Sequence, residues 1–309
     1  MPPDFDAFWA RTLAEQARQR LDLTVTAVNT PLTQLRVHDV RFTGADGQRV
    51  AAWWIVPAHA PGPVPVIVQF MGYGGGRASW MTHLLWAAAG YGHLVVDTRG
   101  QGTDTGDEPA ARPEAPSWGP GFVTRGLDDR ETYYYRRVFV DAVRAVAAVD
   151  GLPGADPERI SVLGTSQGGG IALACASLEP RVRAVLVDVP FMCDWRAGVR
   201  DAATPPYREV AEYVRMRPGS YDRVHGTLDY FDAVNFARRA TAPAIVAIAA
   251  EDTVCPAPGV RAMVAAYAGP VQAVEYPYGD HVDGGFYREH AQIARQLVWL
   301  AERGLAPAR

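Results

Sequence analysis

The stretch ISVLGTSQGG, residues 160–169, decides the fold of this chain. Its first four residues form a short apolar strand pattern, and a helical pattern begins at Gln167. A GxSxG sequence between a strand and a helix is typical of a nucleophile elbow, in which a serine occupies a strained turn. Glycine at both flanking positions allows the two backbones to pass closely, and the turn lifts the serine hydroxyl above the carboxyl edge of the sheet. The stretch therefore predicts a parallel sheet with Ser166 at its edge.

Apolar strand patterns alternate with helical patterns on both sides of this turn. The predicted strands are Leu35–Phe42, Val50–Val56, Val64–Phe70, His93–Asp97, Ile160–Leu163, Val182–Asp188, Ala244–Ala250 and Val271–Tyr276. The predicted helices are Asp4–Arg20, Ser79–Gly90, Glu131–Asp150, Gln167–Leu178, Val260–Tyr267 and Phe286–Ala301. This alternation predicts an α/β fold with a mostly parallel sheet and helices on both faces. The first two strands form a hairpin, and they add antiparallel strands at one edge.

Two segments interrupt the alternation. Thr103–Arg130 is rich in Gly, Pro and Asp, and we expect a long loop that lies near the site. Phe191–Asp232 carries many aromatic residues, which favours a helical insertion over the sheet. The chain has no internal repeat and no obvious linker. We therefore expect one α/β-hydrolase domain over residues 1–309.

Composition excludes several classes of protein. With 48% hydrophobic and 21% charged residues among 309, the chain is neither disordered nor fibrous. The 30 basic and 34 acidic residues give a net charge of −4, which argues against nucleic acid as a partner. All the basic residues are arginine, so chemistry based on lysine, such as a Schiff base or a P-loop, is excluded.

The three cysteines do not form a disulfide framework or a pattern with metal-ligand spacing. They are Cys175, Cys193 and Cys255, and we expect buried thiols in a reducing compartment. The N-terminus has early acidic residues and no apolar run, and Ala242–Ala250 is only half of the ~18 residues that a membrane span needs. The sequence thus predicts a cytoplasmic protein that has no metal and no contact with a membrane.

A serine nucleophile needs a general base, and in this fold a histidine follows the nucleophile and the acid along the chain. Three of the seven histidines follow Ser166. His225 lies in the insertion, and His290 lies inside the closing helix. His281 lies in a glycine-rich loop after the last strand, where the base must reach the edge of the sheet. We expect His281 to be the base.

The acid has two candidates at the ends of neighbouring strands. Asp252 follows the strand AIVAIAA, and a carboxylate there can accept the imidazole proton and fix its tautomer. Asp188 ends the preceding strand, whose loop some members of this fold use. We expect Asp252 and keep Asp188 as the alternative.

Acyl transfer also needs donors for the oxyanion. The backbone N–H of Gln167 follows from the elbow itself. We expect a second donor in the loop Gly72–Gly76, where Tyr73 offers its backbone amide. The alternative is a flexible glycine loop in which Tyr73 only packs.

Further motifs accompany the elbow. Arg99-Gly100-Gln101 follows the strand HLVVD directly, the segment TRGLDDRETYYYRRVFVDAVRAV spans residues 124–146, and a histidine loop reads Tyr278-Gly279-Asp280-His281. With these motifs in this order, essentially the whole chain resembles the acetyl xylan esterase/cephalosporin C deacetylase family, carbohydrate esterase family 7.

This resemblance implies a serine esterase that removes acetyl groups from sugars, xylo-oligosaccharides, cephalosporin C or similar small alcohol esters. It implies no metal or organic cofactor, and a homo-oligomer that is commonly a hexamer with its active sites facing an internal cavity. By position it implies Ser166 as nucleophile, Asp252 as acid, His281 as base, an oxyanion hole of the Tyr73 and Gln167 amides, and a bracing role for Arg99, Gly100 and Gln101.

One departure from the family pattern concerns the third motif. The family has Glu after the histidine, and here Val282 stands in that place with Asp283 next. The change leaves the triad intact but bears on loop geometry and substrate preference. Two other readings stay open on sequence alone: another hydrolase or acyl transferase of this fold, such as a peptidase or a natural-product tailoring enzyme, and a hydrolase fold that serves as a binding module.

Overall fold

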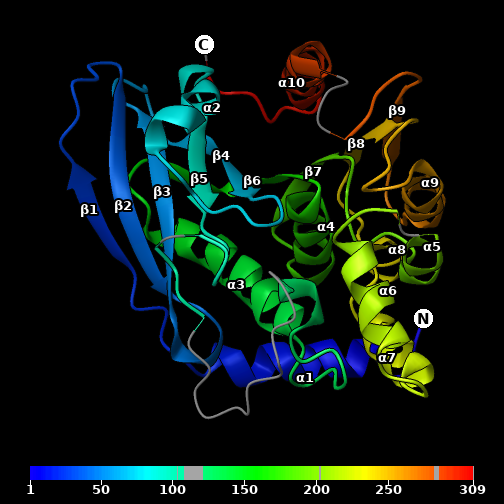
Figure 1. The fold of residues 1–309 in the computed structure, drawn as a ribbon. Helices are drawn as coiled ribbons and strands as arrows, with labels where there is room; N and C mark the ends of the chain where they lie inside the picture. The colour runs from blue at the N-terminus through cyan, green and yellow to red at the C-terminus, as the bar shows by residue number, and fades with distance from the viewer. Residues whose placement is uncertain (103, 108–120, 202, 282–284, 309) are drawn as a thin grey trace.

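A computed structural model describes residues 1–102, 104–107, 121–201, 203–281 and 285–308. Within these ranges nine strands form one sheet in the order β1-β2-β3-β5-β4-β6-β7-β8-β9 (Figure 1). The strands are β1 Thr24–Val28, β2 Leu35–Thr43, β3 Arg49–Pro57, β4 Val64–Phe70, β5 Gly92–Val96, β6 Ala155–Thr165, β7 Val182–Asp188, β8 Ala244–Ala249 and β9 Val271–Tyr276.

The sheet has an antiparallel part and a parallel part. Strands β1, β2, β3 and β5 pair antiparallel in that order, whereas β5, β4, β6, β7, β8 and β9 run parallel to one another. This confirms the predicted α/β-hydrolase fold with its antiparallel edge strands. Strand β1 is missing from the predicted set because TVTAV is only five residues long and none of its residues is buried, so it gives a weak apolar signal.

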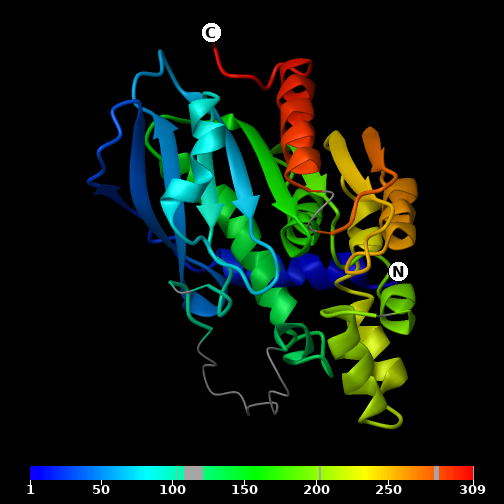
Figure 2. The same ribbon diagram turned by 45° about the horizontal axis from the view of Figure 1, so that its top comes forward.

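Helices cover both faces of the sheet. Figures 1 and 2 show α2 and α10 on one face and α1, α3 and α4 on the other. The helices are α1 Phe5–Ala17, α2 Leu84–Ala88, α3 Tyr134–Ala148, α4 Gln167–Leu178, α5 Trp195–Arg200, α6 Tyr207–Arg215, α7 Tyr221–Leu228, α8 Ala233–Ala237, α9 Ala257–Ala266 and α10 Gly285–Ala301.

The two faces of the sheet bury separate apolar clusters. The larger cluster joins the strands to α1, α3, α4, α8 and α9, and it includes Trp9, Phe139 and Phe236. The smaller cluster joins the opposite face to α2 and α10 through Trp86 and Trp299. The central strands are buried on both sides, as a parallel sheet between two helical layers requires.

One predicted helix is shorter than expected. The segment Ser79–Gly90 divides into a 3₁₀ turn, Trp80–His83, and the short helix α2. The Ser79 side chain accepts a hydrogen bond from the Met81 N–H and so caps the tighter turn. An apolar periodicity alone does not distinguish this arrangement from one continuous helix, because both bury the same face against β3 and β5.

The segment Phe191–Asp232 is helical, as predicted, and carries α5, α6 and α7. Helix α6 packs against the turn Phe122–Thr124, and α5 packs against α9. The insertion therefore lies beside the carboxyl edge of the parallel strands (Figure 2).

A cavity of about 850 Å³ opens at the opposite edge of the sheet, where the parallel strands begin. Its lining includes Leu32, Val64, Gly90 and Pro307 and none of the predicted site residues. In an open parallel sheet, ligands bind outside the carboxyl ends of the strands. The edge of the sheet that carries Ser166 is therefore the candidate site.

Candidate active site

Ser166 occupies the turn between β6 and α4. Its φ of 56° and ψ of −121° lie outside the regions that L-residues commonly adopt, so the turn is strained. A Cβ at Gly164 would stand 2.1 Å from the Gly168 carbonyl group, and a Cβ at Gly168 would stand 2.1 Å from the Phe70 carbonyl oxygen. The strand and helix can pass at this distance only because both flanking residues are glycine.

The structure brings Ser166, His281 and Asp252 into one hydrogen-bonded chain. His281, in the loop after β9, places Nε2 3.0 Å from Ser166 Oγ and Nδ1 2.8 Å from Asp252 Oδ2. With Nδ1 protonated, the imidazole donates to the carboxylate and its Nε2 accepts from the serine hydroxyl. In this tautomer the imidazole is set to receive the serine proton.

Backbone N–H groups hold the Asp252 carboxylate through the oxygen that does not contact His281. Its Oδ1 accepts hydrogen bonds from the N–H groups of Val254 and Cys255, each at 2.8 Å, and its side chain is fully buried. Oδ2 remains directed at His281. The alternative acid, Asp188, accepts instead from the Gln296 side chain of α10, at 3.1 and 3.3 Å.

The two other histidines that follow Ser166 lie elsewhere. His225 is buried on α7 with its ring centroid 4.3 Å from that of Tyr221, and His290 is exposed on α10. Neither has a hydrogen bond to Ser166 among the described contacts.

The segments that carry the two predicted oxyanion donors meet at the elbow, where Gln167 Nε2 donates to the Met71 carbonyl oxygen at 3.2 Å. Gln167 is the first residue of α4, and the first N–H groups of a helix have no acceptor within it. Tyr73 lies in the loop after β4, where its hydroxyl donates to Glu209 Oε2 at 3.1 Å and accepts from the Val123 N–H at 3.2 Å. Burial raises the pKa of the Tyr73 phenol and also that of Glu209. The phenol is thus engaged with α6.

Gln101 joins the glycine loop to Gln167. Its Oε1 accepts from the Gly74 N–H at 2.7 Å and from Gln167 Nε2 at 3.1 Å. Its Nε2 donates to Gln167 Oε1 and to the Tyr134 hydroxyl, both at 2.9 Å. One side chain therefore connects the backbone next to Tyr73 with the residue that follows the nucleophile.

Three consecutive tyrosines at the start of α3 fix the loops around the site. The hydroxyls of Tyr133–Tyr135 donate, in order, to the carbonyl oxygen of Val123 at 3.0 Å, the carbonyl oxygen of Arg99 at 2.5 Å and Gln167 Oε1 at 2.7 Å. All three are fully buried, and burial raises their pKa values. Sequence reasoning does not predict this anchoring role, although a run of three tyrosines at the start of a helix is a signal for it.

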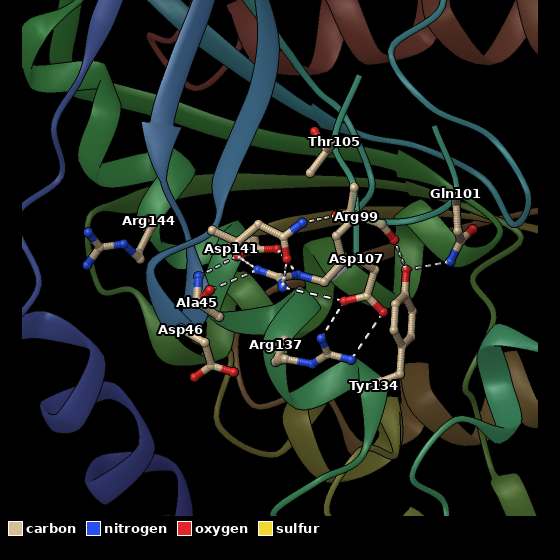
Figure 3. A network of polar contacts seen from close by, with 12 residues as sticks. Ala45, Asp46, Arg99, Gln101, Thr105, Asp107, Tyr134, Arg137, Asp141 and Arg144 are labelled. Carbon is tan, nitrogen blue, oxygen red and sulfur yellow. Dashed lines mark hydrogen bonds and ion pairs between the residues drawn. The ribbon is translucent and has the colours of Figure 1, made fainter. Parts of the chain in front are cut away.

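A buried ionic network lies beneath this region (Figure 3). Arg99 donates from Nε and Nη2 to both oxygens of Asp141, at 2.7 and 2.8 Å, and from Nη1 to Gln48 at 2.7 Å. Asp107 stands 3.6 Å from Arg99 and also pairs with Arg137. Burial lowers and the Asp141 carboxylate raises the pKa of Arg99, with a net increase. The guanidinium therefore remains charged.

Gly100 makes the turn between Arg99 and Gln101 possible. Its φ is +71°, and a Cβ there would stand 2.8 Å from the Asp107 side chain. The three residues Arg99, Gly100 and Gln101 thus connect the buried network to the loops of the site.

Cys255 also belongs to the site, although sequence spacing gave no sign of it. Its Sγ lies 3.9 Å from Ser166 Oγ, and burial raises the pKa of its thiol well above the ordinary value. One potential ligand atom each from Asp252, Cys255 and His281 lie within 4.8 Å of one another. The prediction of no metal-ligand pattern came from spacing along the chain, and these three residues meet only through the fold.

Some predictions fall on residues outside the described ranges. Val282 and Asp283 lie there, and so do residue 103 and residues 108–120 of the predicted loop. The described end of that loop contacts the site, since the Phe122 ring packs edge-on against Tyr73 with centroids 6.3 Å apart.

The chain is similar over most of its length to known acetyl esterases. A family model for acetyl xylan esterase (AXE1) matches residues 1–301. Acetyl esterase Axe7A from Xylanibacter ruminicola is 28% identical over 304 residues, which cover 98% of this chain and 67% of that protein.

Two solved structures agree with this match. An acetyl xylan esterase from Paenibacillus sp. R4 superposes with a TM-score of 0.89 at 35% identity, covering 96% of this chain and 94% of the other. Acetyl xylan esterase 1 from Thermoanaerobacterium sp. JW/SL YS485 superposes with a TM-score of 0.86 at 31% identity, covering 94% and 92%. On these matches the chain belongs to the acetyl xylan esterase (AXE1) family and is a carboxylic ester hydrolase.

Proposed function

We propose that this esterase removes acetyl groups from acetylated xylo-oligosaccharides with Ser166 as nucleophile, His281 as general base and Asp252 as the residue that orients the base. The observation that carries the proposal is the hydrogen-bonded chain from Asp252 through His281 to Ser166 at a strained strand-to-helix turn. The names of the matching family and of the two similar solved structures support xylan as the source of the substrate.

In the acylation step, Ser166 Oγ attacks the acetyl carbonyl carbon while its proton moves to His281 Nε2. The buried Asp252 carboxylate stabilises the imidazolium that forms. The backbone N–H groups of Gln167 and Tyr73 donate to the oxyanion of the tetrahedral intermediate, and Gln101 holds the two donors in register. His281 then gives the proton to the sugar oxygen, and the alcohol leaves.

In the deacylation step, His281 takes a proton from water and the resulting hydroxide attacks the acetyl group on Ser166. Collapse of the second tetrahedral intermediate returns the proton to Ser166 Oγ and releases acetate. Every proton transfer in this cycle uses the same imidazole nitrogen, so no metal or organic cofactor is required by the proposal.

The substrate class can be tested with the purified protein. Acetylated xylo-oligosaccharides, cephalosporin C and aryl acetates are compared by kcat/KM, with Ser166→Ala measured in parallel. We expect acetate release from all three that depends on Ser166, with the highest kcat/KM on the oligosaccharides. Acetate release that persists in Ser166→Ala, or a higher kcat/KM on cephalosporin C or the aryl acetates than on the oligosaccharides, would contradict the proposal.

We also propose that the protein forms a homo-oligomer. The resemblance to the family implies a hexamer. Light scattering during gel filtration measures the mass directly, and a species of the 33.5 kDa chain mass alone would contradict this.

For location, we propose the cytoplasm. All three cysteines are free and buried, which fits a reducing compartment. Within the described part of the chain, no helix combines the length and apolar character that a membrane crossing requires. Fractionation of the source cells tests the proposal, and recovery outside the cytoplasm would contradict it.

A further inference from the structure

We propose that this catalytic edge also binds a thiophilic divalent cation such as Zn²⁺, held by Cys255 Sγ and His281 Nε2 with Ser166 Oγ as a third ligand, and that the cation inhibits the enzyme reversibly. The inhibition rests on the proposed function, because the cation occupies the nitrogen that we propose as the base. The binding itself does not depend on that function.

Two of the three distances between the ligand atoms are close to those around a tetrahedral ion. Zinc binds sulfur at about 2.3 Å, imidazole nitrogen at about 2.0–2.1 Å and oxygen at about 2.0–2.2 Å, so tetrahedral ligand atoms stand about 3.4–3.6 Å apart. Here Ser166 Oγ lies 3.9 Å from Cys255 Sγ and 3.0 Å from His281 Nε2. Shifts of about 0.3–0.4 Å would place both pairs at zinc distances.

Asp252 supplies the outer shell that a metal-bound histidine needs. Its Oδ2 accepts from His281 Nδ1 at 2.8 Å, which leaves Nε2 directed at Ser166 Oγ, 3.0 Å away. Histidine ligands of zinc typically donate their other N–H to a carboxylate in this way. The arrangement that prepares the imidazole as a base therefore also prepares it as a ligand.

The donor set selects the kind of cation. Thiolate and imidazole favour Zn²⁺ and other soft or borderline ions, whereas Mg²⁺ and Ca²⁺ prefer oxygen ligands. On binding, the Cys255 thiol releases its proton to solvent and the thiolate coordinates the ion, while the neutral imidazole donates the Nε2 lone pair. The ion enters from the solvent side, where the His281 side chain is 16% exposed and Ser166 is half-buried.

Inhibition follows from occupation of Nε2. While that lone pair is bound to the ion, it cannot accept the Ser166 proton, so acylation stops. Removal of the ion by a chelator restores the lone pair and the activity. Zn²⁺ thus acts on the resting enzyme by competing with proton transfer.

Binding is tested first, without reference to activity. Equilibrium dialysis measures Zn²⁺ bound per chain, and Co²⁺ in place of Zn²⁺ reports a bound thiolate through a charge-transfer absorption band. We expect a single ion per chain and the band in the wild type and in Ser166→Ala. We expect Cys255→Ala to abolish the band and to weaken Zn²⁺ binding by at least the ~10–100-fold that loss of an outer-shell partner costs. The matched control is Cys175→Ala, which removes another buried thiol, at α4.

Inhibition is tested second, on an aryl acetate, with each variant compared with its own rate in the absence of metal. Zn²⁺ should inhibit the wild type and Cys175→Ala equally. Cys255→Ala should need at least about tenfold more Zn²⁺ for the same inhibition. Mg²⁺ should have no effect on the rate. Equal Zn²⁺ inhibition of Cys255→Ala and wild type, or no cobalt–thiolate band in the wild type, would overturn the proposal. If the ion binds through Cys255 but Ser166→Ala retains esterase activity, the proposed triad fails and the metal site stands.

Discussion

Two acid–base contacts in this molecule have nearly the same length and opposite consequences. Asp252 meets His281 at 2.8 Å, and Asp141 meets Arg99 at 2.7 and 2.8 Å. Arg99 is 1% exposed and stays charged at any pH that the fold survives. An imidazole can accept and release a proton during turnover, and His281 also contacts a serine hydroxyl. The comparison teaches that the chemistry of the base, and not the distance, separates a catalytic contact from an architectural one.

The largest effect is expected at the nucleophile. Ser166→Ala removes the attacking oxygen and should lower kcat by about 10⁶-fold, as loss of a triad nucleophile does in serine proteases. The free energy of unfolding should not fall, because the buried contacts of the elbow are made by backbone and glycine. The measurements are kcat on an aryl acetate and urea unfolding. Ser161→Ala, on the preceding strand β6, is the matched control and should retain activity.

A smaller loss is expected when the acid loses its charge. Asp252→Asn keeps the shape of the side chain but stabilises the wrong imidazole tautomer, so kcat should fall about 10⁴-fold. Asp188→Asn is the control, since the Asp188 carboxylate accepts from Gln296. A large loss for Asp188→Asn with a small loss for Asp252→Asn would mean that the acid lies on the preceding strand.

A substitution in the buried Arg99–Asp141 pair should lower the free energy of unfolding more than it lowers kcat. Arg99→Met leaves Asp141 and Asp107 buried without their shared cation, and removal of one partner from a buried pair costs about 3–5 kcal/mol of unfolding free energy. Urea unfolding measures this loss. The exposed pair of Arg200 with Asp201 is the control, and Arg200→Met should leave the midpoint almost unchanged. Equal effects of the two substitutions would remove the distinction.

Gln101 connects the two regions and should show an intermediate effect. Gln101→Ala frees the Gly74 N–H and the Gln167 side chain, so the oxyanion donors lose their support. We expect kcat to fall by less than the ~10²–10³-fold that loss of a donor itself costs, with KM nearly unchanged. A rise in KM with constant kcat would assign Gln101 to substrate binding instead.

The smallest effect is expected at the Tyr73 phenol. Tyr73→Phe removes the hydrogen bond to Glu209 but keeps the backbone N–H that we propose as an oxyanion donor. Activity on an aryl acetate should therefore change little. A loss above about 100-fold would show that the hydroxyl is the donor, and proline at position 73, which lacks the N–H, would then be no more harmful than phenylalanine.

Much of the fold could be predicted because its signals are local. The GxSxG spacing at the elbow and the apolar runs in the central strands can be recognised from neighbouring residues in the sequence, and the structure contains both. Strand β1 and the division of Ser79–Gly90 depend on edge pairing and capping, which periodicity does not report. The expectation of one domain over residues 1–309 stays a prediction, and a single cooperative unfolding transition is the outcome that it requires.

The candidate site was harder to predict wherever its contacts join distant residues. Asp252 and Asp188 end neighbouring strands and look alike in the sequence. Their partners differ only in the fold, where Gln296 reaches Asp188 from 108 residues away. The Tyr73 contact with Glu209 and the approach of Cys255 to Ser166 are of the same kind, spanning 136 and 89 residues.

The central claim is that Ser166 carries the acetyl group during turnover. The most direct measurement is mass spectrometry of the enzyme quenched in acid during hydrolysis of an aryl acetate, followed by digestion and mapping of the modified peptide. We expect one added acetyl group on the peptide that contains Ser166 in the wild type, and none in Ser166→Ala. In Asp252→Asn the acetyl-enzyme should accumulate if deacylation slows more than acylation. An acetyl group on another residue, or steady turnover by Ser166→Ala, would contradict the account.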